Sequence, residues 1–171
     1  MMIKWITSIL ILLAPFISQA EKYEYAGYYG SGEMSWFVFD ISNGRISMGN
    51  AILDNIVYKD CSNTKFKCIE TGNEIYFAPR IINRSGEYTS PFGNYEIYSN
   101  KQRLPFNTNI EYKIIKIYPY FSEVKTIFYN TQKGVLAILE EDKQHQFASH
   151  IAWLMSQCGL LSDEDCLEEV E

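Results

Sequence analysis

From Tyr23 to Leu139 the chain is a succession of short runs rich in aromatic and β-branched residues, separated by glycine-containing turns. The run 34–41 ends at Ser42-Asn43-Gly44 and is followed by the run 45–48, and a second pair of runs flanks Thr71-Gly72-Asn73. Because glycine adopts a positive φ without steric cost, each such break is typical of a β-hairpin. The pattern predicts an antiparallel sheet of roughly 8–10 short strands, either a sandwich or a strongly curved, barrel-like sheet.

The stretch from residue 80 to residue 109 differs from its neighbours in its density of turn-forming residues. It contains Asn83-Arg84-Ser85-Gly86 and Ser90-Pro91-Phe92-Gly93-Asn94 within a few residues of each other. Such clusters of Gly, Pro, Asn and Ser are typical of loops. We therefore predict loops here, around one short strand at residues 95–98.

After residues 140–142 the spacing of apolar residues changes from two towards that of a helix. At about 100° per residue one face collects several apolar side chains, namely Phe147, Ile151, Leu154, Met155 and Cys158. Gly159 is placed to end this helix in a left-handed cap. A second short helix is predicted to begin at Ser162, with Asp165 as a capping-box variant. The expected fold class is α+β, a β-rich sheet with a C-terminal helix and a short helix packed on it.

Residues 1–20 have the features of a secretory signal peptide. Lys4 supplies a positive start, residues 5–17 are apolar, and Ser18-Gln19-Ala20 matches the small-x-small cleavage pattern. The apolar run is shorter than the roughly 20 residues of a membrane-spanning helix. We expect cleavage near Ala20 and export to the bacterial periplasm or medium. The mature chain, residues 21–171, would be one domain with a β-rich part (21–139) and an acidic helical hairpin (140–171).

The four cysteines form two pairs that are close in sequence, Cys61 with Cys68 and Cys158 with Cys166. In an exported protein an even number of cysteines is typical of disulfides. Three connectivities are possible, and we favour the local one because each pair bounds a turn-like segment. The alternative, a four-cysteine zinc site, fits these spacings poorly. No cofactor is expected.

The acidity of the protein is concentrated at its C-terminal end. Residues 21–139 carry 13 basic and 12 acidic side chains, whereas residues 140–171 carry 9 acidic side chains and Lys143 alone as a base. The sequence pI of about 5.0 argues against a nucleic-acid partner, which would attract cationic proteins. On the predicted helix Trp153 faces away from the apolar side. We predict that Trp153, Asp163, Glu164 and Asp165 bind a protein partner, one that is cationic. A solvated acidic surface with a buried Trp153 is the alternative.

The sequence contains no recognisable catalytic or metal-binding motif. His145 and His150 are five residues apart and would not share one face of a helix, and the serine motif of hydrolases is absent. Glu33 and Asp40 are the carboxylates we would test first for glycan hydrolysis, although a strand would hold them over about 20 Å apart. On these grounds we predict a binding protein of the inhibitor or immunity type rather than an enzyme. The alternatives are an envelope hydrolase that uses carboxylates and a structural envelope component.

Overall fold

The computed structural model describes residues 22–29, 31–48, 51–53, 58–72, 74–98, 110–141, 148–156 and 158–163. The predicted signal peptide of residues 1–20 and its cleavage site lie outside these residues. Every regular element in the described part is a β-strand, and none of the described residues is helical. The α+β prediction is therefore wrong, and the described part of the chain is all-β.

The thirteen strands of the described residues fall into three consecutive groups along the chain. The first comprises β1 (Lys22–Tyr29), β2 (Met34–Asp40), β3 (Arg45–Met48) and β4 (Ala51–Leu53). The second comprises β5 (Tyr58–Asp60), β6 (Phe66–Thr71) and β7 (Glu74–Pro79). The third comprises β8 (Gly86–Ser90), β9 (Gly93–Tyr98), β10 (Lys113–Pro119), β11 (Lys125–Asn130), β12 (Gly134–Glu141) and β13 (Ala148–Leu154).

The first and third groups join into one ten-stranded antiparallel sheet with the order β4-β3-β2-β1-β13-β12-β11-β10-β9-β8, while β5, β6 and β7 form a separate sheet. The first and third groups meet where β1 pairs with β13, with Gly27 opposite Ala152. A Cβ atom on Gly27 would lie 1.9 Å from the carbonyl oxygen of Ile151. Glycine at this position therefore permits the close contact that connects the first and last strands.

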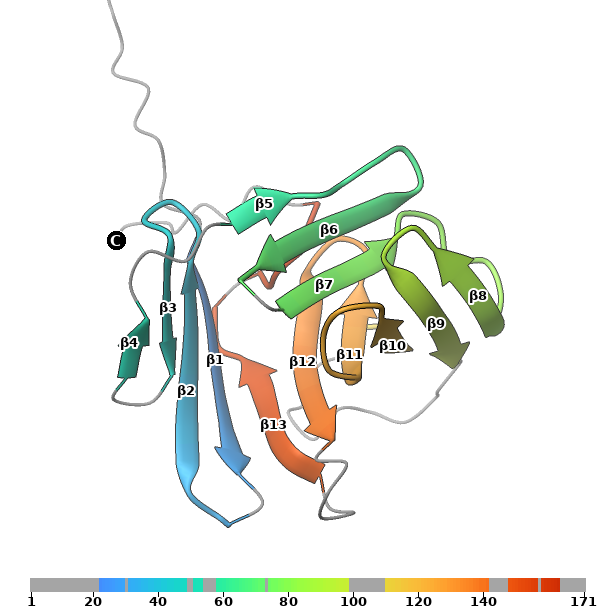
Figure 1. The fold of residues 1–171 in the computed structure, drawn as a ribbon. Helices are drawn as coiled ribbons and strands as arrows, with labels where there is room; N and C mark the ends of the chain where they lie inside the picture. Colours follow the sequence, from blue (N-terminus) through green and yellow to red (C-terminus); the bar gives the residue numbers. More distant parts are fainter. Residues whose placement is uncertain are drawn as a thin grey trace, which may run out of the picture.

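The core lies between the two sheets. In Figure 1, β6 and β7 run across the large sheet, at a steep angle to β11 and β12. The Tyr76 ring of the small sheet packs edge-on against Phe39, with ring centroids 5.7 Å apart, and Phe66 and Phe77 contact Tyr95 at 5.9 and 5.8 Å. Ring pairs of this geometry bury a large apolar area and fix the orientation of the packed elements. These aromatic contacts position the small sheet on the large one.

The segment predicted as the C-terminal helix is the central strand β13. It pairs with β1 on one side and β12 on the other, so its backbone groups are bonded on both sides. Its burial follows the strand period. His150 and Ala152, two residues apart on one face, are 3% and 1% exposed, whereas Trp153, on the other face, is only half-buried. The neighbouring strands thus decide the conformation that the sequence period left open.

Gly159 also has a role other than the predicted helix cap. Its amide donates a hydrogen bond to the carbonyl oxygen of Lys133, 2.8 Å away. A Cβ atom there would lie 1.9 Å from the carbonyl oxygen of Val135, so the glycine lets this segment pack directly on β12. Ser162 and Asp163, at the start of the second predicted helix, are non-helical, and residues 164–171 lie outside the described part.

Candidate functional site

A disulfide joins Cys61 and Cys68, whose Cα atoms are 4.9 Å apart, as predicted. It closes the β5–β6 connection, and Cys68 is fully buried. Within this connection the Ser62 hydroxyl accepts a hydrogen bond from the amide of Cys68 at 3.0 Å. Hydrogen bonds from the side chain and backbone of Ser62 hold the pKa of Asp60 below its ordinary value. Cys158 is also disulfide-bonded; Cys166 lies outside the described residues, so that pairing stays a prediction.

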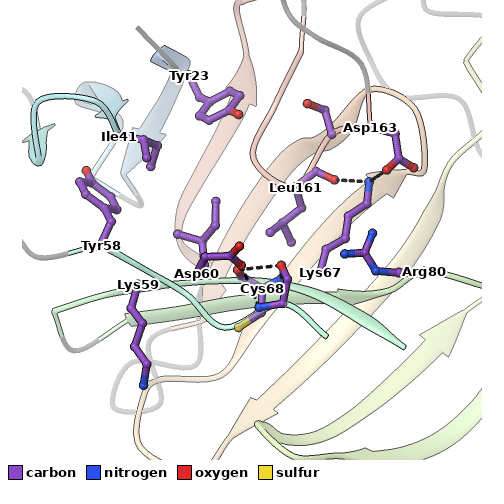
Figure 2. Close-up of a pocket in the computed structure, with 13 residues that line it drawn as sticks. Tyr23, Ile41, Tyr58, Lys59, Asp60, Lys67, Cys68, Arg80, Leu161 and Asp163 are labelled. Carbon is purple, nitrogen blue, oxygen red and sulfur yellow. Dashed lines mark hydrogen bonds and ion pairs between the residues drawn. The ribbon is translucent and has the colours of Figure 1, made fainter. Parts of the chain in front are cut away.

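Beside the disulfide lies a cavity of about 300 Å³, which we call the disulfide pocket (Figure 2). One side is aromatic and aliphatic, with Tyr23, Ile41 and Tyr58. The opposite side carries Lys67 and Arg80. The remaining polar and apolar lining residues include Lys59, Asp60, Ser62, Cys68, Leu161 and Asp163.

Lys67 is the most buried charged side chain of this pocket, with 6% of its surface exposed. Its ammonium donates to the carbonyl oxygen of Leu161 at 2.9 Å and more weakly to that of Thr131 at 3.4 Å. The Asp163 carboxylate lies 2.6 Å from the same ammonium. Because a buried charge is tolerated only when it is paired and hydrogen-bonded, these contacts fix the segment around Leu161 against β6.

A second hollow lies at the β8 end of the large sheet, and we call it the edge groove. Its volume is about 770 Å³, and its lining comes from three adjacent strands: Glu87, Tyr88, Thr89, Asn94, Tyr95, Glu96 and Tyr118. In the strand register Glu87 is opposite Glu96, and Glu96 is opposite Lys116. Side chains directly opposite each other lie on the same face of a sheet. Glu87, Glu96 and Lys116 therefore lie in a row on one face of the sheet, with the two carboxylates next to each other.

Tyrosines hold one of these carboxylates in place. The Tyr118 hydroxyl donates to Glu96 Oε1 at 2.7 Å, and the Tyr98 hydroxyl donates to Glu96 Oε2. Tyr88 stacks on Tyr95, with ring centroids 5.3 Å apart and planes inclined by 18°, but these two residues alternate with Glu87 and Glu96 along their strands and point to the opposite face of the sheet. On the face of the carboxylates the groove combines the fixed Glu96 with the ring of Tyr118, a combination suited to cations.

A buried charged cluster lies on the inner face of the large sheet. Lys125, 1% exposed, forms an ion pair with Glu74 of β7 and lies 3.6 Å from Glu140 of β12. Its ammonium is also 5.2 Å from the centre of the Tyr76 ring. Burial raises the pKa of Glu140, and burial lowers the pKa of the adjacent His150 to about 4. His150 is therefore neutral at pH 7.

The residues of the predicted partner surface have different surroundings. Trp153 lies on β13, half-buried, with its ring 6.2 Å from that of Phe128. Asp163 is exposed and paired with Lys67 in the disulfide pocket. Glu164 and Asp165 lie outside the described residues. A shared partner surface for these four residues stays a prediction.

The first carboxylate pair chosen from the sequence is separated by a whole strand. Glu33 precedes β2 in an exposed turn, whereas Asp40 ends β2 and accepts hydrogen bonds from the amide and side chain of Asn43. The pair that does come together, Glu87 and Glu96, was missed because residues 80–94 were predicted as loops. The signal was local: Ser90 pairs with Gly93 across a tight turn, which makes residues 86–98 a hairpin.

The described residues contain no helix with the length and apolarity needed to cross a membrane, and no group of three potential metal ligands. A comparison with protein-family models, curated proteins and solved structures found no match to this chain.

Proposed function

We propose that this protein is an exported, disulfide-stapled binding protein of the inhibitor or immunity type, and that the edge groove receives a cationic segment of its partner. The observation that carries the proposal is the facing pair Glu87 on β8 and Glu96 on β9, at the β8 edge of the large sheet. The disulfide between Cys61 and Cys68 fits an extracellular or periplasmic location.

The strand β8 supports a docking role because it is an edge strand. Among the described strands it pairs with β9 alone, which leaves one row of its amides and carbonyls without a strand partner. The sequence of β8, Gly-Glu-Tyr-Thr-Ser, contains no lysine or proline, the residues that commonly protect sheet edges. An extended peptide can add to such an edge by backbone hydrogen bonds.

The charges of the groove favour a basic peptide over other extended segments. Like charges placed directly across a strand pair destabilise a sheet. Lys116 lies opposite Glu96 on the side away from Glu87, and a second cation next to Glu87 and Glu96 would reduce the repulsion between these two carboxylates. Glu96 is already fixed by Tyr118 at 2.7 Å, so little side-chain entropy is lost when an arginine or lysine binds it. The Tyr118 ring, on the same face as Glu96, adds surface for stacking against an arginine side chain.

Binding of a fluorescent nine-residue peptide of alternating lysine and threonine tests this proposal. We expect saturable binding that weakens with salt, and no binding of the matched glutamate–threonine peptide. The double substitution Glu87→Gln and Glu96→Gln should weaken binding about tenfold, since charge-assisted hydrogen bonds are lost. Glu33→Gln, at an exposed turn away from the groove, is the matched control. Equal affinity of wild type and double variant would refute the assignment of the groove.

The same pair of carboxylates favours a second candidate, hydrolysis of cell-wall glycans. Cross-strand neighbours have Cβ atoms about 4.5–5.5 Å apart, so the side chains of Glu87 and Glu96 can bring their carboxyl groups to the roughly 5 Å separation of retaining glycosidases. Glu96, held by Tyr118, would be the nucleophile and Glu87 the acid and base. Turnover of peptidoglycan fragments by the purified protein, abolished by either Glu→Gln substitution, would replace the binding proposal. If the protein binds the peptide and does not turn over these fragments, the glycan-hydrolase hypothesis is excluded.

A further inference from the structure

The disulfide pocket carries an inference that is independent of the edge groove. We propose that it binds a small organic anion, an aromatic ring bearing one carboxylate, with the ring against Tyr23, Ile41 and Tyr58. The carboxylate would bind Arg80 and take the place of Asp163 on Lys67. In the structure Asp163 would then serve as an internal substitute for the ligand.

Lys67 has both neutral and negatively charged partners in this pocket. Two of its contacts are neutral carbonyl oxygens, of Leu161 and Thr131. The negative charge beside it comes from Asp163, whose side chain is 58% exposed. A carboxylate this exposed can leave for water at little cost, whereas the ammonium, 7% exposed, cannot. The pocket therefore contains a buried cation with an exchangeable counter-charge.

Arg80 lines the same pocket. Its Nε donates to the carbonyl oxygen of Asn63 at 2.9 Å, which anchors the guanidinium at the pocket. Figure 2 shows this guanidinium beside Lys67, on the same side of the cavity as Asp163. A guanidinium held at one nitrogen still offers its terminal nitrogens, in a geometry that matches a carboxylate.

The opposite side of the cavity is the surface against which the ring of the ligand would pack. The Tyr58 hydroxyl donates to the carbonyl oxygen of Arg45 at 2.6 Å, and burial raises the pKa of Tyr58 to about 12. The ring is thus held in place as a neutral phenol, with Ile41 and Tyr23 on the same side (Figure 2). Ligand pockets are commonly apolar with a few polar groups that fix orientation. A volume of about 300 Å³ limits the ligand to roughly one ring.

Titration of the full oxidised protein with 4-hydroxyphenylacetate, followed by NMR chemical shifts, tests the proposal. We expect saturable shifts at residues of the disulfide pocket and much weaker binding of the neutral 4-hydroxyphenylacetamide. Arg80→Gln should weaken binding of the acid about tenfold, and Arg80→Lys should weaken it less. Lys65 is an exposed residue of the β5–β6 connection that does not line the pocket. The control substitution Lys65→Gln should leave binding of the acid unchanged.

The variant Asp163→Asn tests whether the carboxylate of the ligand displaces that of Asp163 from Lys67. Removing the competing carboxylate should strengthen binding of the acid severalfold and leave the amide unchanged. Equal binding of acid and amide, unaltered affinity in Arg80→Gln, or unaltered affinity in Asp163→Asn would each overturn the proposal. The Glu87→Gln and Glu96→Gln double variant should bind the acid like wild type, so failure at the edge groove and failure here are distinguishable.

Discussion

Two buried lysines connect parts of the molecule that are far apart in sequence, and they are stabilised in different ways. Lys125 lies between Glu74 of the small sheet and Glu140 of the large sheet, both carboxylates. Lys67 has one carboxylate, Asp163, and two carbonyl oxygens. The Lys125 cluster therefore joins the two sheets by charge, whereas Lys67 holds the segment 158–163 largely through backbone carbonyls.

The comparison shows that burial alone does not set the energetic role of an ion pair. The partners of Lys125 are 37% and 26% exposed, and the carboxylate partner of Lys67 is 58% exposed. If the lysine is removed, the two glutamates keep partly buried charges, but Asp163 can turn into water. Leaving a buried charge unpaired costs more than leaving a carbonyl unbonded. The Lys125 cluster should therefore be the more sensitive of the two.

The largest effect is expected for Lys125→Met. It removes the cation that lies between the carboxylates of Glu74 and Glu140, which should lower the free energy of unfolding by about 3–5 kcal/mol at pH 7. Urea unfolding followed by circular dichroism measures this loss. A cost no greater than that of Lys67→Met would contradict the distinction between the two lysines.

The second effect is a pH dependence of the free energy of unfolding that arises from the Lys125 cluster. The pKa of His150 is lowered to about 4 in the folded state, so between pH 6.5 and 4 the unfolded chain binds more protons than the folded one. The free energy of unfolding should fall by roughly 3 kcal/mol as the pH drops through this window.

Glu140 opposes this effect, because its pKa is raised by burial and its contribution to stability increases as the pH falls. The variant His150→Gln should lose the decline due to His150 and retain the contribution of Glu140. Urea titrations of wild type and variant at pH 7, 5.5 and 4.5 measure the difference. Parallel pH profiles would show that His150 is not the titrating group.

The third effect concerns the disulfide beside Lys67. Replacing Cys61 and Cys68 together by serine removes a short cross-link and should cost about 2–3 kcal/mol by loop entropy. Differential scanning calorimetry of oxidised wild type and the double variant measures it. Because the bond is adjacent in sequence to Lys67, this cost should not add independently to that of Lys67→Met. If the two losses in free energy of unfolding add fully, the disulfide and Lys67 stabilise the protein independently.

The smallest of these effects is expected for Lys67→Met, about 2 kcal/mol, since carbonyls of Leu161 and Thr131 lose a donor while Asp163 becomes solvated. Hydrogen exchange gives the sharper readout. The amide of Asp163 donates to Gln132 and that of Val135 donates to Leu160, and both should exchange faster in this variant. Unchanged protection at Asp163 would mean that Lys67 does not hold the segment.

The features that sequence predicted correctly are those determined by residues close together in the chain. The hairpin at Asn43-Gly44 forms with Gly44 at a φ of 61°, and Gly72 occupies the β6–β7 turn at a φ of 55°. The disulfide between Cys61 and Cys68 spans seven residues. A turn or a short loop needs only a few residues to specify it, so its signal is present in the local sequence.

Tertiary structure alone decided the features that depend on distant partners. Residues 148–154 have a spacing that fits a helix, yet they form a strand because β1 and β12 bond to both of its edges. The ion pairs of Lys67 and Lys125 and the pairing of Glu87 with Glu96 likewise depend on strand register. Local periodicity determines which side chains can share a face, but the register and the packing of the two sheets determine which charges meet.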